Sequence, residues 1–195
     1  MSAYTTRLKL EKQVSGENSG NWGNLVNYVF NRIDSTVRGY VSVNVAGSAN
    51  VTLVSNNSTT NTSEGADDQV HNKVIELTGA LGAAINVFTD AVEGEYIIHN
   101  NTSGAYALTF GNTGHAANGI AITQGSRAIV YTDGSTMYNA ISAGGANTQV
   151  QYNNSGVFAG SANLIFDGTN LTAAGIVTAE GGQLSTTGKS FVMGF

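Results

Sequence analysis

The sequence predicts a mainly β protein: an N-terminal strand and one amphipathic helix, an antiparallel β-sandwich or jelly-roll-like domain, and a C-terminal shaft of short hairpins. Apolar residues recur at helical spacing convincingly only in residues 21–37. Most of the remaining chain alternates apolar and polar residues in short segments between Gly-, Asn- and Asp-rich turns. Charged residues make up only 11%, against about 25% in ordinary soluble domains. We expect three parts: residues 1–39, 40–142 and 143–195.

The first part begins with a segment, residues 4–14, whose alternation predicts a strand or an extended arm. Residues 15–20 are rich in Ser, Gly and Asn and predict a turn, after which Ser19 or Asn21 can cap a helix. The helix should end near Gly39, because glycine commonly terminates helices.

The apolar stripe of this helix is the main candidate for a functional surface. Full burial of its seven side chains is worth roughly 10 to 20 kcal/mol, and an isolated helix of this length is marginal in water. The stripe must therefore be covered in the working protein, and we expect it to form an oligomer or docking interface. The sole tryptophan, Trp22, is either a core anchor or an interface anchor. The stripe consists of Trp22, Leu25, Val26, Val29, Phe30, Ile33 and Val37.

The second part predicts a series of short strands. Residues 47–50 are interpreted as a hairpin connection and residues 55–68 as a long exposed loop. Between residues 70 and 142, strands follow one another about a dozen residues apart, a rhythm typical of an antiparallel sandwich. Asp133-Gly134 is the strongest hairpin signal. We expect the strand aromatics to pack in the core, namely Tyr96, Tyr106, Phe110, Tyr131 and Tyr138.

The third part consists of very short hairpins with turn signals at residues 153–156 and 167–170. An isolated hairpin is marginally stable, so several copies wrapped about one axis are expected to stabilise each other. Cysteine is absent, which excludes disulfides and thiol chemistry and makes oligomerisation the expected source of stability.

The charged residues argue against several classes of function. A net charge of −5 with only 8 Lys and Arg disfavours nucleic-acid binding, and the apolar runs are too short to span a membrane. Arg32, like the other N-terminal basic residues, is interpreted as a solvated or interface charge. Scattered acids and histidines lack catalytic or metal-ligand spacing, so we expect no enzyme, cofactor or metal site. The acids, interpreted as solvated turn residues, and the histidines are Glu93, Glu95, Asp67, Asp68, Asp133, Asp167, His71, His99 and His115.

Three stretches resemble bacteriophage tail fibres and tail-associated proteins. RLKLEKQVSGENSGNWGNLVNYVFNRID resembles the strand, polar turn, Trp-Gly and helix that open many of them. The segment from VIELTGAL to GSRAIVYTDGSTMYNA resembles a β domain that often follows. ANTQVQYNNSGVFAGSANLIFDGTNLTAAG resembles a repeat found ahead of a fibre shaft or chaperone.

The resemblance implies a homotrimeric structural protein of the virion tail, made in the host bacterial cytoplasm. Its N-terminus would dock to tail, adaptor or portal-proximal proteins, and its C-terminus would project outward for host attachment, either directly or through a distal receptor-binding protein. Three alternatives stay open: a host-surface glycan-binding module, a polysaccharide depolymerase tailspike, and a capsid decoration protein.

Overall fold

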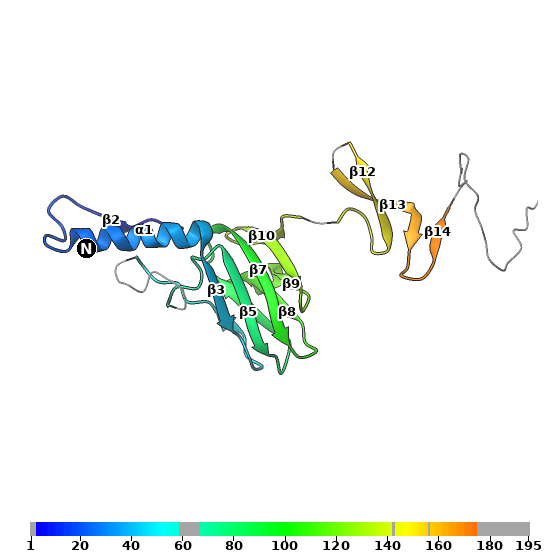
Figure 1. Cartoon of the computed structure of the whole chain (residues 1–195), viewed down its shortest axis with the longest axis horizontal. Coiled ribbons are helices and arrows are strands. Elements are labelled where there is room, and N and C mark those ends of the chain that lie inside the picture. Colours follow the sequence, from blue (N-terminus) through cyan, green and yellow to red (C-terminus); the bar gives the residue numbers. More distant parts are fainter. Residues whose placement is uncertain (1–2, 59–66, 142, 156, 175–195) are drawn as a thin grey trace, which may run out of the picture. The chain divides into compact units, whose positions relative to one another are not determined.

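The computed structural model describes residues 3–58, 67–141, 143–155 and 157–174. Contacts divide the chain into two compact units, Met1–Ile141 and Ser142–Phe195, which are described separately. The described residues are mainly β and contain a single α-helix, as the sequence predicts (Figure 1).

The first unit begins with two short strands, β1 (Ala3–Tyr4) and β2 (Glu11–Lys12), which pair antiparallel. Helix α1 spans Trp22–Arg38, which confirms the helix expected from the apolar spacing. The helix ends at Gly39, whose N–H donates to the carbonyl of Ser35 at 2.6 Å. The extended conformation of Gly39 then starts the first strand of the β domain.

Two sheets make up the β domain. The first has the strand order β11-β10-β7-β5-β3, and the second has the order β4-β6-β8-β9. A short 3₁₀ turn, Ala116–Asn118, precedes β9. The strands of the first sheet are β3 (Tyr40–Asn44), β5 (Val74–Ala80), β7 (Glu93–Ser103), β10 (Arg127–Asp133) and β11 (Met137–Asn139). Those of the second are β4 (Val51–Thr52), β6 (Ile85–Thr89), β8 (Leu108–Asn112) and β9 (Ile120–Ile122).

The central strand pairings are parallel, so the prediction of an antiparallel sandwich is wrong for this part. From β3 to β8 the chain alternates between the two sheets, and each strand pairs in parallel with the one laid down two strands earlier. The chain therefore winds in successive coils. Within the β domain, antiparallel pairing is confined to β7–β10, β10–β11 and β8–β9. Alternating hydrophobicity reports which face of a strand is buried and carries no information on strand direction.

The structure confirms one of the two predicted hairpin turns in the β domain and contradicts the other. Asp133-Gly134 joins β10 to β11 as a hairpin, as predicted. Residues 47–50 were predicted to form a hairpin connection, which is wrong, because the strands on either side belong to different sheets. Gly47 has a φ of 113° and lies where the chain crosses from one sheet to the other, beside Leu81 of the next coil.

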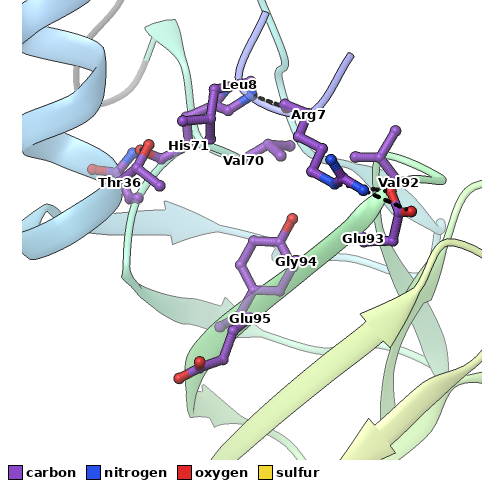
Figure 2. Close-up of a pocket in the computed structure, with 11 residues that line it drawn as sticks. Arg7, Leu8, Thr36, Val70, His71, Val92, Glu93, Gly94 and Glu95 are labelled. Carbon is purple, nitrogen blue, oxygen red and sulfur yellow. Dashed lines mark hydrogen bonds and ion pairs between the residues drawn. The ribbon is translucent and has the colours of Figure 1, made fainter. Parts of the chain in front are cut away.

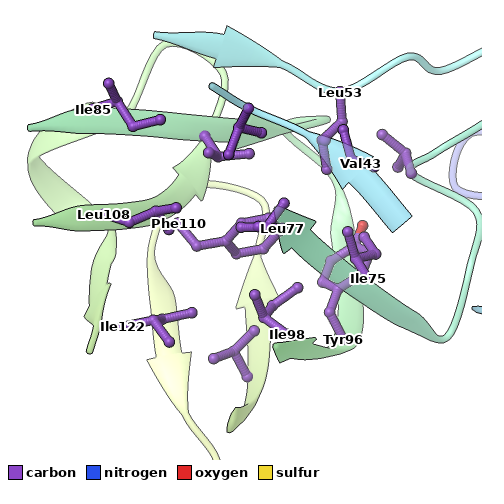
Figure 3. Packing of buried hydrophobic residues seen from close by; sticks show 14 of the residues in the cluster. Val43, Leu53, Ile75, Leu77, Ile85, Tyr96, Ile98, Leu108, Phe110 and Ile122 are labelled. Atoms are coloured by element: carbon purple, nitrogen blue, oxygen red, sulfur yellow. The ribbon is translucent and has the colours of Figure 1, made fainter. Parts of the chain in front are cut away.

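The hydrophobic core lies between the two sheets (Figure 3). Tyr96 and Phe110 meet there edge to face, with ring centroids 5.8 Å apart, which confirms their predicted core position. Tyr106, Tyr131 and Tyr138 are exposed instead. Tyr131 and Tyr138 follow the buried Val130 and Met137 along their strands, so their side chains alternate to the outer face.

The described part of the second unit is a three-stranded antiparallel sheet of β12 (Gln149–Asn154), β13 (Val157–Phe166) and β14 (Leu171–Ala173). Asp167 organises the predicted turn at residues 167–170, because its Oδ1 accepts hydrogen bonds from the N–H groups of Thr169 and Asn170. Large apolar side chains of this sheet, including Phe158 and Leu171, are exposed. The rest of the predicted shaft, residues 175–195, lies outside the described residues, and the shaft itself stays a prediction.

Candidate oligomer interface

One face of helix α1 is an exposed apolar surface. Trp22, Phe30 and Val37 expose 59%, 61% and 61% of their surface, and Ile33 exposes 39%. Val26 and Val29, between them along the helix, are half-buried. Six of the seven stripe residues thus retain accessible apolar surface. We call these six residues, Trp22, Val26, Val29, Phe30, Ile33 and Val37, the helix seam.

The seam has the spacing of a coiled-coil contact. Trp22, Val26, Val29 and Ile33 follow one another at alternating steps of four and three residues, the repeat that keeps apolar side chains facing a partner helix. Phe30 and Val37 widen this line to one side. The indole of Trp22 is at the surface of the described chain and is not a core anchor.

The face of the helix next to the seam packs against its own chain, whereas the face opposite the seam is polar and carries the exposed Asn24 and Asn27. Leu25, which the sequence groups with the stripe, is 4% exposed and buried within this chain. Arg32 is fully buried. Thr36 Oγ1 donates to the carbonyl of Arg32 in the preceding turn and lies within 3.4 Å of the carbonyl of His71. The helix is therefore fixed to the β domain on one side and bare on the other.

A buried polar cluster, formed by Arg32, Asp68 and His71, fixes the helix. Arg32 Nε lies 2.8 Å from Asp68 Oδ2, and His71 Nδ1 lies 2.8 Å from Asp68 Oδ1. An Arg32 terminal nitrogen also donates to the carbonyls of Leu8 at 3.1 Å and Asn56 at 2.8 Å. The cluster thus joins the N-terminal arm, the helix and the segment before β5.

Burial lowers the pKa of the Arg32 guanidinium, and the negative charge of Asp68 partly opposes that shift. His71 Nε2 lies 3.1 Å from the carbonyl oxygen of Arg7, which links the cluster to the N-terminal arm. The interpretation of Arg32 and Asp68 as solvated or turn charges is wrong, because both side chains are fully buried. Arg32 and His71 are 39 residues apart in the chain, and no local sequence pattern links such distant residues.

A small cavity lies beside this cluster (Figure 2). Its walls come from the N-terminal arm, the end of α1 and the start of β7, and the exposed Arg7–Glu93 ion pair, 3.0 Å long, borders it. Its volume is about 60 Å³. A cavity of this size holds water, whereas ligand pockets span roughly 300–1,000 Å³. The site therefore suits hydration of the cluster and not a sugar or a cofactor.

Several of the other titratable groups form pairs within the described residues. His99 Nδ1 lies 3.4 Å from Glu76 Oε1, and Lys73 Nζ lies 2.8 Å from Glu95 Oε1. No group of three or more His, Cys, Asp or Glu side chains converges as a metal site in this part of the chain. Among the helices described here, none is long and apolar enough to cross a membrane.

Comparison of the chain with protein-family models, with curated proteins and with solved structures finds no match. Any proposal about function therefore rests on the geometry above, in which the helix seam is an exposed apolar surface.

Proposed function

We propose that this protein is a structural subunit of a bacteriophage tail, a homotrimeric tail fibre or fibre adaptor. In this proposal the N-terminal helix associates with its copies and with the tail, and the C-terminal hairpins project outward toward the host. The single observation that carries the proposal is the exposure of Trp22, Phe30 and Val37 on one face of a helix whose neighbouring face is anchored in the chain.

Physical chemistry supports an oligomer over a lone chain. Contiguous exposed apolar surface marks interaction sites in soluble proteins, and a coiled-coil contact buries such a seam between helices. The exposed apolar side chains of the second unit add surface of the same kind, including Tyr152, Phe158 and Phe166. With no cysteine available for a disulfide, association is the stabilising device open to this chain.

The test is the molar mass of the full chain in solution, measured by light scattering. We expect the wild-type protein to be a trimer. Phe30→Asp places a charge in the seam and should yield monomers, because a buried unpaired charge costs several kcal/mol per ion.

Asn27→Asp is the matched control, since Asn27 is exposed on the polar face of the same helix. It adds the same charge and should leave the trimer intact. A wild-type monomer at tens of micromolar would contradict the proposal, and so would a Phe30→Asp variant that keeps the trimer mass.

A further inference from the structure

The outer face of the first sheet carries an apolar row across four strands. Tyr40 on β3 lies in register with Val74 on β5, which lies in register with Ile97 on β7, and Ile97 pairs in turn with Ile129 on β10. Tyr40 is 58% exposed, and the other three are half-buried. An outer sheet face is usually polar when the inner face forms the core, so this row indicates a face that is covered in the assembled protein.

The edge of the same sheet is unprotected. Strand β3 is the terminal strand of its sheet and contains no charged residue, no proline and no bulge, although these are the usual devices that prevent edge pairing. Val41 and Val43 direct their side chains into the core, whereas the side chains of Tyr40, Ser42 and Asn44 are exposed. At β3, therefore, both the outer face and the edge of the first sheet are uncovered in the described chain.

This open region continues directly from the helix seam. Only Arg38 and Gly39 separate Val37 from Tyr40. The junction is tight, because a Cβ at Gly39 would lie 2.4 Å from the Ser35 carbonyl oxygen and 2.6 Å from Asn72 Oδ1. The Gly39 N–H bonds to the helix, and its carbonyl accepts from Val74 of β5. A short, tightly packed junction therefore joins helix and sheet, so copies joined through the seam would hold their sheets close to one another.

The charges on this face suit a second copy of the same chain. Glu76 on β5 and Arg127 on β10 both lie in register with His99, in the row next to the apolar one. Arg127 forms no ion pair with any described residue. If the β10 side of one copy meets the β3 side of the next, Arg127 approaches Glu76 of its neighbour. Such a head-to-tail contact closes into a ring when the rotation between copies is a whole fraction of a turn, as it is in the proposed trimer.

We infer that a second copy of this chain covers the outer face of the first sheet at β3, so that the oligomer contact extends from the helix seam across Tyr40 and Ser42 to the row of Glu76 and Arg127. This inference rests on the proposed homotrimer. It adds that the β domain, and not the helix alone, forms the subunit contact.

The absence of cysteine permits a direct test with one introduced thiol. Ser42→Cys places the thiol on the inferred contact, and Thr52→Cys, on an exposed residue of β4 in the other sheet, is its matched control. The reaction rate of each full-chain variant with a maleimide is measured under conditions where light scattering reports the oligomer. We expect Ser42→Cys to react at least about tenfold more slowly, because packed interface centres exclude solvent.

A charge variant provides the second arm. Arg127→Glu should raise the dissociation constant of the oligomer at least about tenfold, as expected for like charges brought together across an interface, whereas Thr52→Glu should not change it. Equal reaction rates of the two thiols in a wild-type-like trimer, or an unchanged dissociation constant for Arg127→Glu, would overturn the inference and leave the helix-mediated trimer standing. A monomeric wild-type protein would overturn both.

Discussion

Arg32 and Asp68 show how single buried charges set the position of the helix. Both side chains are fully buried, and removing water from an ion is costly unless a partner charge and hydrogen bonds replace it. Asp68 supplies the partner charge, and the carbonyls of Leu8 and Asn56 accept hydrogen bonds from the guanidinium. The pair therefore holds together three segments that are far apart in the chain.

Replacing one member of the pair should be strongly destabilising. Asp68→Asn leaves the Arg32 charge buried without its counter-ion, and we expect a loss of about 3–5 kcal/mol in the free energy of unfolding. Urea unfolding followed by circular dichroism measures it. Asp67→Asn is the matched control, because the neighbouring Asp67 is exposed and should change stability by less than about 0.5 kcal/mol. Equal effects of the two substitutions would contradict the assigned role of Asp68.

Asp133 gives a pH-dependent prediction at the same scale. Hydrogen bonds from the backbone N–H groups of Thr136 and Ser135 lower the pKa of its carboxyl from 3.8 to about 2. A lowered pKa in the folded state means that the carboxylate stabilises the hairpin above pH 3.8 and that this contribution is lost as the pH falls through about 2.

An NMR titration should therefore place the midpoint of the Asp133 carboxyl near pH 2, with the amide shifts of Ser135 and Thr136 following the same curve. A midpoint close to 4, with those two amides unaffected, would show that the hydrogen bonds are absent in solution.

At the scale of elements, the junction between α1 and β3 depends on a residue without a side chain. Gly39 has a φ of −65°, which every residue can adopt. Its requirement for glycine is therefore steric, since an added Cβ would lie 2.4 Å from a backbone oxygen. Gly23, within the first turn of the same helix, has open space where its Cβ would be.

The two glycines should respond in opposite ways to substitution by alanine. Gly39→Ala should lower the free energy of unfolding by about 1–3 kcal/mol, because the backbone must shift to relieve the overlap. Gly23→Ala should raise it by up to about 1 kcal/mol, because alanine favours the helix more than glycine does. Thermal denaturation of both variants measures the difference. A neutral Gly39→Ala variant would mean that the junction is looser than the structure shows.

The coiled winding of the β domain is also an element-scale feature. Parallel pairing of β3, β5 and β7, and of β4, β6 and β8, brings together residues from successive coils. Val74 pairs with Ile97 as Ile85 pairs with Leu108, so the two sheets advance by the same number of residues from the second coil to the third. The antiparallel strands β9, β10 and β11 then complete the domain.

At the scale of the whole molecule, the described chain is well packed in one place and open in others. The core between the two sheets is closed, whereas the helix seam, the outer face at β3 and the sheet of the second unit all expose large apolar side chains. A trimer would cover such surfaces by repeating one contact three times, which fits the proposed fibre. Each unit then contributes its own part of that assembly.

The sequence predicted features that depend on local order. The helix over Trp22–Arg38 followed from apolar spacing, and the β10–β11 hairpin followed from Asp133-Gly134. Both signals act over a few neighbouring residues, where backbone sterics and side-chain periodicity decide the outcome. The sequence also identified the apolar residues of the helix, but it did not show which of them face solvent.

By itself, then, the sequence determined the type of each of these elements and the identity of the apolar residues on the helix. Tertiary structure alone decided that the central strands run parallel, that Leu25 and Arg32 pack inside while Trp22 and Phe30 face outward, and that Asp68 meets Arg32. The physical reason is that strand direction and long-range pairing depend on how distant segments bury each other. Apolar residues that repeat every two or 3.6 residues indicate a strand or a helix, but they do not specify which other segment packs against it.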